Sequence, residues 1–115
     1  MSKGTYVIVR GQYEFTHCYP EAPDEVSYLR DLHRHLFNYE VEIEVYHDDR
    51  ELEFIMVKHV LEDFLATRYT LWSTRTSCEQ MADSIADCLQ SKYGFLRYLS
   101  VKVFEDNENG AKIIR

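Results

Sequence analysis

The chain has 115 residues, of which 45% are hydrophobic, and it contains nine tyrosines. This composition suits one domain, 1–115, with a single core, and it is too apolar for a disordered chain. The formal net charge of −7 and the lack of a Lys/Arg cluster argue against a nucleic-acid partner. No leader peptide or membrane-length apolar run is visible, so we expect a cytoplasmic protein with no membrane partner. Cys18, Cys78 and Cys88 include no C-x-x-C pair, which indicates reduced thiols.

Two long strands are predicted in the first half of the chain. In 5–17, TYVIVRGQYEFTH, most apolar residues and His17 share the odd positions, which is the period of a strand. The next ten residues contain both prolines and several acids, which predicts a loop. From His33 to Val45 the odd positions read His, His, Phe, Tyr, Val, Ile, Val, whereas the even positions from 38 to 44 read Asn, Glu, Glu, Glu. This alternation is typical of an antiparallel strand with one face in the core and the other in water.

The period changes in the middle of the chain. A turn is predicted at 48–50, and 51–57, ELEFIMV, is interpreted as a short returning strand. Apolar residues then follow at spacings of three and four, which predicts an amphipathic helix. Its stripe consists of Val57, Val60, Leu61, Phe64, Leu65 and Leu71.

A second helix is predicted after a break at 72–75. Thr76 and Glu79 fit the capping box, in which the Thr side chain caps the helix and the Glu reaches back. Gly94 is interpreted as the C-terminal stop. Residues 98–105 then return to strand, 106–110 predicts a hairpin turn from its Asn-Gly pair, and 111–115 closes as a short last strand.

The main elements therefore follow the order ββααββ. We predict an α+β fold in which a four-stranded antiparallel sheet carries two helices on one face.

Polar side chains end the predicted core rows of three strands: His17, His33 with His35, and Glu105. Burying such groups without partners costs about 1–3 kcal/mol each, so a shared site is expected. Three imidazoles leave a tetrahedral zinc ion one open position, as in catalytic or ligand-binding zinc sites. The alternative is that His33 and His35 hydrogen-bond to backbone at a strand end.

Two interpretations of Glu105 also stay open. Its carboxylate is either at the exposed rim of the sheet, a common position for acids, or it anchors a ligand. As an anchor it would accept two parallel N–H bonds from a guanine-like or pterin-like edge.

Taken together, these residues resemble the 6-pyruvoyltetrahydropterin and 6-carboxytetrahydropterin synthases, a family with the tunnelling fold (T-fold), whose module is ββααββ. The matching pieces occur in the family's order and span nearly the whole chain. They are Phe15-x-His17, Leu32-His33-x-His35 with Phe37, the passage 53–61 (EFIMVKHVL), Thr76-Ser-Cys-Glu79, and Val101-Lys-Val-Phe-Glu105.

The resemblance implies that His17, His33 and His35 bind zinc and that Glu105 anchors the pyrimidine edge of a pterin- or purine-like small molecule. It also implies a ring-shaped homo-oligomer with its sites between subunits. Two further pocket residues would then come from a neighbouring subunit: Thr76 and Ser77.

The sequence departs from the family at its proton-transfer groups. Leu29 stands where the family has a catalytic cysteine, four residues before the first His of the pair. No histidine follows His59, so the family's Asp-His relay is absent as written. Arg34 replaces a glycine between the paired histidines, and its parity directs it away from the metal. We therefore assign no catalytic residues.

Three functions are compatible with this pattern. We favour a protein that binds a pterin-, purine- or nucleotide-like molecule at a zinc-containing site between subunits, without efficient catalysis. The first alternative is an active zinc-dependent lyase acting on dihydroneopterin triphosphate, although general acid–base groups contribute about 10²–10⁴-fold to such reactions. The second alternative is a zinc-stabilised oligomeric scaffold.

Overall fold

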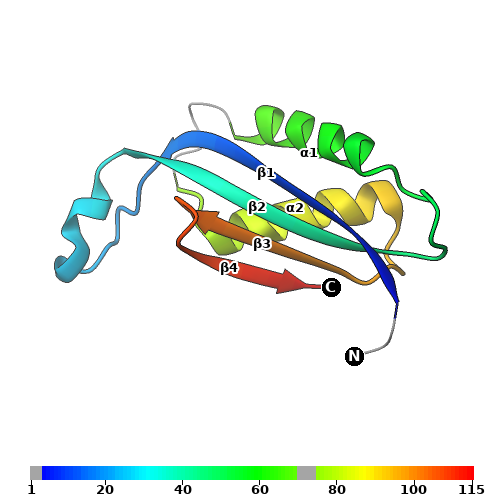
Figure 1. Ribbon diagram of the computed structural model, residues 1–115. Helices are drawn as coiled ribbons and strands as arrows, with labels where there is room; N and C mark the ends of the chain where they lie inside the picture. Colours follow the sequence, from blue (N-terminus) through cyan, green and yellow to red (C-terminus); the bar gives the residue numbers. More distant parts are fainter. Residues whose placement is uncertain (1–3, 70–74) are drawn as a thin grey trace.

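The computed structural model of the chain describes residues 4–69 and 75–115. Four strands form one antiparallel sheet in the order β1-β2-β3-β4, and two α-helices lie between β2 and β3 in sequence (Figure 1). The predicted ββααββ order is confirmed. The elements are β1 (Thr5–His17), the 3-10 helix η1 (Asp24–Arg30), β2 (His33–Val45), α1 (Phe54–Arg68), α2 (Cys78–Tyr93), β3 (Leu99–Glu105) and β4 (Asn109–Ile114).

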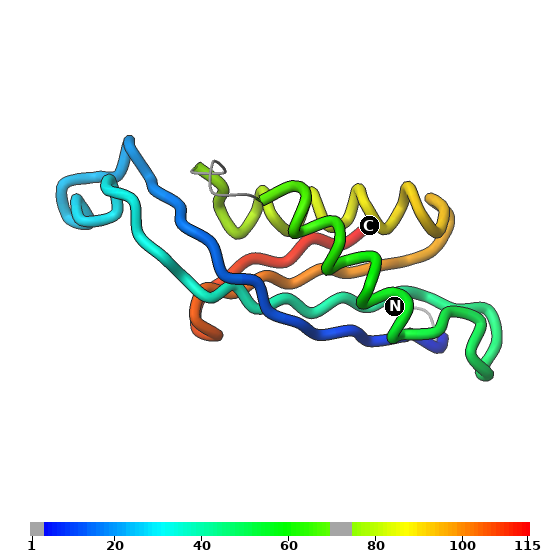
Figure 2. Tube along the Cα trace, turned by 90° about the horizontal axis from the view of Figure 1, so that it is seen from above, coloured from blue at the N-terminus to red at the C-terminus, as the bar shows by residue number. Residues whose placement is uncertain are grey.

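Both helices cover the same face of the sheet, as Figure 2 shows, and the strand residues of the hydrophobic core share the odd positions. The side chains that the strands contribute to the core are Val9, Phe15, Phe37, Tyr39, Val41, Ile43, Leu99, Val101 and Val103. Each helix contributes an apolar stripe to this core: Val57, Leu61 and Leu65 in α1, and Met81, Ile85 and Leu89 in α2. The two predicted helices on one face of the sheet are therefore confirmed.

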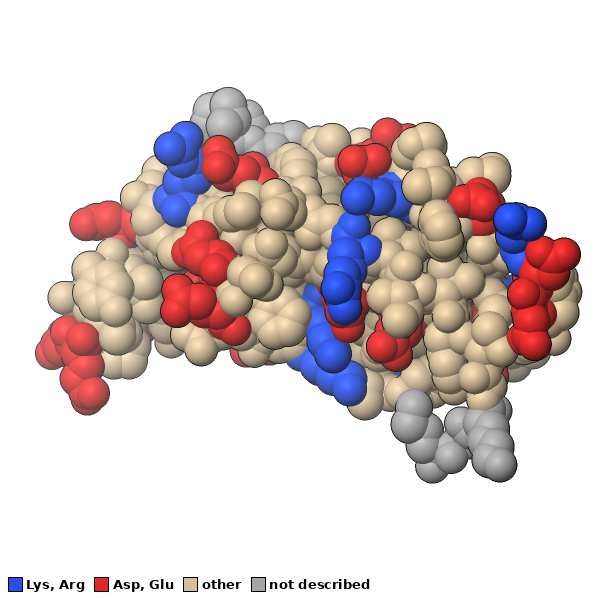
Figure 3. All heavy atoms as spheres, viewed as in Figure 1, with Lys and Arg blue, Asp and Glu red and all other residues tan. Residues whose placement is uncertain are grey.

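The opposite face of the sheet carries no helix in the described part of the chain. A short band of basic side chains crosses the strands there, with acidic side chains beside it (Figure 3). Among the polar side chains of β2, Glu40 lies 2.8 Å from Nε of Arg10 and 3.4 Å from Nζ of Lys102. The glutamates at the even positions of β2 therefore belong to a polar sheet face, as the alternation predicted.

Unequal strand lengths determine where the histidines lie. β1 and β2 have 13 residues each, whereas β3 has seven. Since β2 pairs with β3 only from Phe37 to Ile43, the first residues of β2 continue past β3 as a two-stranded ribbon with the end of β1. The β1–β2 connection, residues 18–32, projects beyond that ribbon (Figures 1 and 2). Residues 18–27 were predicted as a loop, but η1 begins within them at Asp24.

The interpretation of 51–57 as a strand is wrong. Residues 54–57 are the first turn of α1, and the Glu53 side chain caps this helix by accepting the N–H of Ile55 at 3.0 Å. Val57 is buried while the three apolar residues before it are exposed, so the apolar run forms a helix start and not a core strand. The predicted position of Leu71 in the stripe lies outside the described residues.

The capping box of α2 is shifted by one residue from the prediction. Ser77, not Thr76, caps the helix: its Oγ accepts the N–H of Gln80 at 3.1 Å, and Oε1 of Gln80 accepts the N–H of Ser77 at 3.1 Å. The C-terminal stop at Gly94 is confirmed, with φ of 101° and its N–H donated to the carbonyl of Gln90 at 2.9 Å.

The hairpin between β3 and β4 forms where it was predicted, although a different part of the segment makes the turn. Asp106 and Asn107 both have positive φ, and the N–H of Glu108 donates to the carbonyl of Glu105 at 3.0 Å. Asp and Asn tolerate this left-handed conformation better than other side chains. The Asn-Gly pair already belongs to β4, where a Cβ on Gly110 would lie 1.9 Å from the carbonyl oxygen of Val103.

Candidate metal centre

The sheet register brings together the three histidines that the sequence analysis singled out. His17 at the end of β1 is paired with His33 at the start of β2, and His35 lies two residues further along the same face. The ring centroids are 4.4 Å apart for His17 and His33, 4.7 Å for His33 and His35, and 5.2 Å for His17 and His35. One ring nitrogen from each histidine lies within 4.8 Å of the others. This is a cluster that could hold a metal ion.

Each imidazole is held at Nδ1 by a hydrogen-bond acceptor. Nδ1 of His17 lies 3.0 Å from the carbonyl oxygen of Thr76, and Nδ1 of His33 lies 2.8 Å from that of Asp31. Nδ1 of His35 lies 2.5 Å from a carboxylate oxygen of Asp106. Because these oxygens accept, each Nδ1 donates, and this tautomer presents the lone pair of a neutral ring at Nε2. Metal-binding histidines in proteins are oriented in the same way.

Nε2 of His17 is a buried nitrogen without a hydrogen-bond partner among the described residues. The residue is only 7% exposed. Burial lowers the pKa of His17, which favours the neutral imidazole that a metal requires. An unpaired buried polar atom costs about 1–3 kcal/mol, and a metal ion would satisfy it.

Glu105 faces the same nitrogens from β3. It is paired with Phe37 in the sheet, and its two carboxylate oxygens lie 3.6 Å from Nε2 of His17 and 3.8 Å from Nε2 of His35. These separations exceed those of charge-assisted hydrogen bonds. The carboxylate is half-buried next to the histidines and remains open to a ligand.

Asp106 is a site residue that sequence reasoning missed. Its carboxylate contacts Nδ1 of His35 and also accepts the N–H of Leu36 at 3.1 Å, while its own N–H donates to the carbonyl of Leu36 at 2.7 Å. The hydrogen bond with His35 lowers the pKa of the Asp106 carboxyl. The sequence does contain a signal for this role: a second acidic residue follows Glu105 directly, in the segment predicted as a turn.

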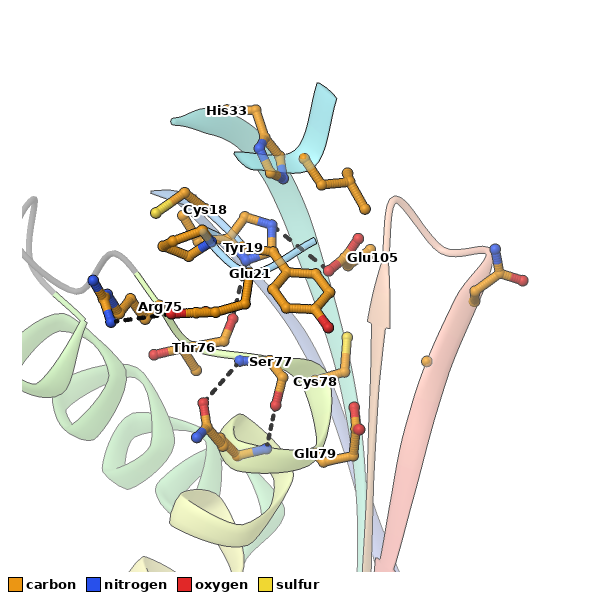
Figure 4. A pocket seen from close by; sticks show the side chains of 16 residues that line it. Cys18, Tyr19, Glu21, His33, Arg75, Thr76, Ser77, Cys78, Glu79 and Glu105 are labelled. Carbon is orange, nitrogen blue, oxygen red and sulfur yellow. Dashed lines mark hydrogen bonds and ion pairs between the residues drawn. The ribbon is translucent and has the colours of Figure 1, made fainter. Parts of the chain in front are cut away.

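A pocket of about 590 Å³ opens beside the cluster. Figure 4 shows it between the start of α2, the end of β3 and the 18–32 segment. Thr76 and Ser77 line it within the chain, beside His17. Their expected contribution to the pocket of a neighbouring subunit stays a prediction. Leu29 also lines the pocket.

The two remaining histidines of the chain are not in this cluster. His47 and His59 are exposed and do not line the pocket. Arg34 points away as predicted, with its Nη1 3.6 Å from a carboxylate oxygen of Glu14. Cys78 lines the pocket, but burial, with the nearby charges of Glu105 and Glu79, raises its pKa to about 12. A thiol with this pKa stays protonated at neutral pH.

The donor set fits a transition-metal ion. Imidazole nitrogen is a ligand for zinc, copper, iron and nickel, whereas magnesium and calcium prefer oxygen. The three oriented imidazoles therefore match zinc, copper, iron or nickel better than magnesium or calcium. One of the three has a buried, unpaired Nε2.

Two further observations concern the chain as a whole. Neither α-helix in the ranges 4–69 and 75–115 is long and apolar enough to cross a membrane. The chain matches none of the protein-family models and none of the curated proteins with which it was compared.

Proposed function

We propose that this chain is a zinc-containing binding protein related to the 6-pyruvoyltetrahydropterin and 6-carboxytetrahydropterin synthases. His17, His33 and His35 would hold the ion, and the adjacent pocket would hold a pterin-, purine- or nucleotide-like molecule anchored by Glu105. Bound zinc supplies a Lewis-acidic coordination position to a ligand oxygen or nitrogen.

The observation that carries this proposal is the hydrogen bonding of the histidines. All three rings are held through Nδ1, and one ring nitrogen of each lies within 4.8 Å of the others, which is the arrangement of metal-binding histidines. The unpaired, buried Nε2 of His17 adds a position where an ion is favourable.

Binding is favoured over conversion because the proton-transfer groups that the resemblance implies are missing. Leu29 occupies the wall where the resemblance places a catalytic cysteine. The Cys78 thiol is held in its protonated form, and Asp106 is engaged by His35. With the zinc ion and the Glu105 anchor but without the family's cysteine and Asp-His relay, the pocket would retain the ligand and leave it largely unchanged.

A homo-oligomer, ring-shaped as in the family, belongs to the same proposal. β1 and β4 are the edge strands of the sheet, and their unpaired backbone groups are suitable for pairing with another copy. Sedimentation velocity on the purified chain would test this: a single monomeric species at micromolar concentration contradicts it.

The metal site is tested by comparing the zinc content of the wild-type chain with that of His33→Ala. We expect close to one zinc per chain in the wild type and a large loss in the variant. His47→Ala is the matched control because His47 is exposed and outside the pocket. Unchanged zinc content in His33→Ala would overturn the site.

Ligand binding and turnover are tested with the zinc-loaded protein. Calorimetry with dihydroneopterin and guanosine should show binding that Glu105→Ala weakens. Mass spectrometry after incubation with dihydroneopterin triphosphate should show little product. Robust turnover would favour the lyase. If neither molecule bound and Glu105→Ala changed nothing, the scaffold would be favoured.

A further inference from the structure

We propose that the chain has a second small-molecule site, between α1 and the edge strand β1, and that this site binds a zwitterionic ligand of the amino-acid class. The carboxylate of the ligand contacts Lys58 and the hydroxyl of Tyr39, and its ammonium group contacts Glu62. The site is separate from the histidine cluster, because the two cavities share no lining residue. The inference therefore goes beyond the proposed function and does not depend on zinc.

The cavity lies at the middle of β1, where α1 packs beside this strand (Figure 1). Its volume is about 680 Å³, which is within the usual range of small-molecule sites. The lining residues come from β1, β2, α1 and the region around the end of β3: 10–12, 38–40, Lys58, Glu62, Phe104 and Asn107. Segments far apart in the sequence thus surround one space.

Unpaired polar atoms distinguish this cavity, as they distinguish the metal centre. Among the described residues, three buried side-chain atoms lack a hydrogen-bond partner: Nε2 of His17, Oδ1 of Asn38 and Oη of Tyr39. The last two belong to residues that line the second cavity, and Tyr39 is only 2% exposed. A buried polar atom without a partner destabilises the fold. A ligand that supplies the missing partners is therefore favourable here.

Gly11 makes room for the Tyr39 hydroxyl at the edge of the sheet. The two residues are paired between β1 and β2, and a Cβ at Gly11 would lie 2.2 Å from Oη of Tyr39. Burial, with the nearby charge of Glu62, raises the pKa of Tyr39 to about 12. The hydroxyl is therefore protonated at neutral pH and offers an O–H donor, which a carboxylate oxygen of a ligand can accept.

Lys58 and Glu62 present opposite charges that are not paired with each other. They lie four residues apart on α1, and neither side chain makes an ion pair within 4–69 and 75–115. Lys before Glu is also the less favourable order for pairing at this spacing. The other two charged lining residues, Arg10 and Glu40, already form an ion pair at 2.8 Å. The cavity thus offers one cation and one anion, and the complementary ligand carries both charges.

The test is an NMR titration of the isotope-labelled chain with L-alanine, L-leucine and L-glutamine. Binding should shift the amide signals of Gly11, Gln12, Lys58 and Glu62 until they saturate. Acetate and methylammonium, which each carry one of the two charges, should bind about tenfold or more weakly than the amino acids. If none of the three amino acids shifts these signals, or if acetate binds as tightly as they do, the inference is overturned.

The role of Lys58 is tested with one substitution and a control. Lys58→Met removes the cation but keeps an unbranched side chain, and it should weaken amino-acid binding about tenfold. Lys92→Met is the matched control, because Lys92 is exposed and lines neither cavity. Equal affinities in the two variants would contradict the proposed site.

Tyr39→Phe gives a result that a merely structural role would not give. The change removes a buried hydroxyl that has no partner, so the melting temperature of the free chain should stay the same or rise. Amino-acid binding should nevertheless weaken, by about threefold to tenfold. A lower melting temperature with unchanged binding would show that the hydroxyl has a partner within the fold, and the inference would fail.

The outcome is independent of the metal centre. The zinc content of Lys58→Met and Tyr39→Phe should equal that of the wild type, because neither residue lines the cavity beside the histidines. Failure of this second site would leave the proposed zinc-containing function intact. Failure of the zinc site would be visible separately in the zinc content of His33→Ala.

Discussion

At the scale of single residues, the imidazole of His35 has an acid on either side. Asp106 contacts its Nδ1, and Glu105 faces its Nε2. The first contact orients the ring and strengthens its basicity, while the second leaves room for a ligand. The two neighbouring acids thus have different consequences for metal binding, although they are consecutive in sequence.

Replacing Asp106 with Asn should weaken zinc binding by about 10–100-fold, the usual effect of altering a group that orients a metal ligand. Asn retains an acceptor and tolerates the positive φ of 52° at this position, so the fold should persist. Zinc affinity measured by competition with a chelator checks the prediction. Glu108→Gln removes an exposed acid from the same turn and should have little effect; equal losses in both variants would point to net charge instead.

The alternation of odd and even positions along the strands was sufficient to predict the histidine cluster, but it could not predict the role of Asp106. In β1 and β2 the period of two is uninterrupted, so His17, His33 and His35 had to share the core face. Asp106 follows the last residue of β3 in a turn with positive φ, where the alternation of a strand no longer determines the direction of a side chain. Its contact with His35, 71 residues earlier in the sequence, depends on tertiary structure.

At the scale of elements, the first turn of α2 joins the helix to the site. Ser77 makes both hydrogen bonds of the capping box, while the preceding residue, Thr76, supplies the carbonyl that holds His17. The capping pattern in the sequence was ambiguous because Thr76 and Ser77 each have a residue three positions later that can reach back, Glu79 and Gln80. Local sequence did not decide between them.

Ser77→Ala should lower the free energy of unfolding by about 1 kcal/mol because the N–H of Gln80 loses its acceptor. Thr76→Ala should cost less, since it keeps the carbonyl that contacts His17 and leaves the cap intact. Urea denaturation of both variants measures the difference. A larger loss in Thr76→Ala would contradict the observed cap.

Gly11→Ala in β1 should destabilise the fold by about 1–3 kcal/mol through steric overlap. A Cβ at this position would lie 2.2 Å from the phenolic oxygen of Tyr39, which is 2% exposed. Gly4→Ala is the control, because its Cβ would meet Tyr6 at an ordinary 3.5 Å. Denaturation midpoints that fall equally in both variants would contradict this explanation.

The interpretation of 51–57 as a strand failed for a physical reason. A short apolar run lacks the length to show whether its period is 2 or 3.6, and here only Val57 of the four apolar residues at the start of α1 is buried. Longer segments with an unbroken period, such as 5–17 and 33–45, coincide with β1 and β2.

At the scale of the whole molecule, the histidine cluster lies where the β1–β2 ribbon leaves the support of β3. An ion bound there would connect the ends of two strands with the turn after β3 through Asp106 and with the start of α2 through Thr76. Metal binding is therefore expected to stabilise the folded chain, since an ion that binds the folded state shifts unfolding by mass action.

Removing zinc with a chelator should lower the melting temperature by several degrees, and adding zinc back should restore it. An ion at about 100-fold above its dissociation constant contributes about 2.7 kcal/mol. Differential scanning calorimetry with and without zinc measures this shift. His33→Ala should abolish it, whereas a shift that survives in this variant would locate the stabilising ion elsewhere.

The turn at 106–108 has one more consequence. Its backbone fixes Glu105 and Asp106 on opposite edges of a single imidazole, and both residues reach His35 only while β3 and β4 keep their present alignment. Adding or deleting one amino acid in this hairpin would displace both acids in a single event. Evolution or engineering should therefore alter the identity of Glu108 far more freely than the length of the loop.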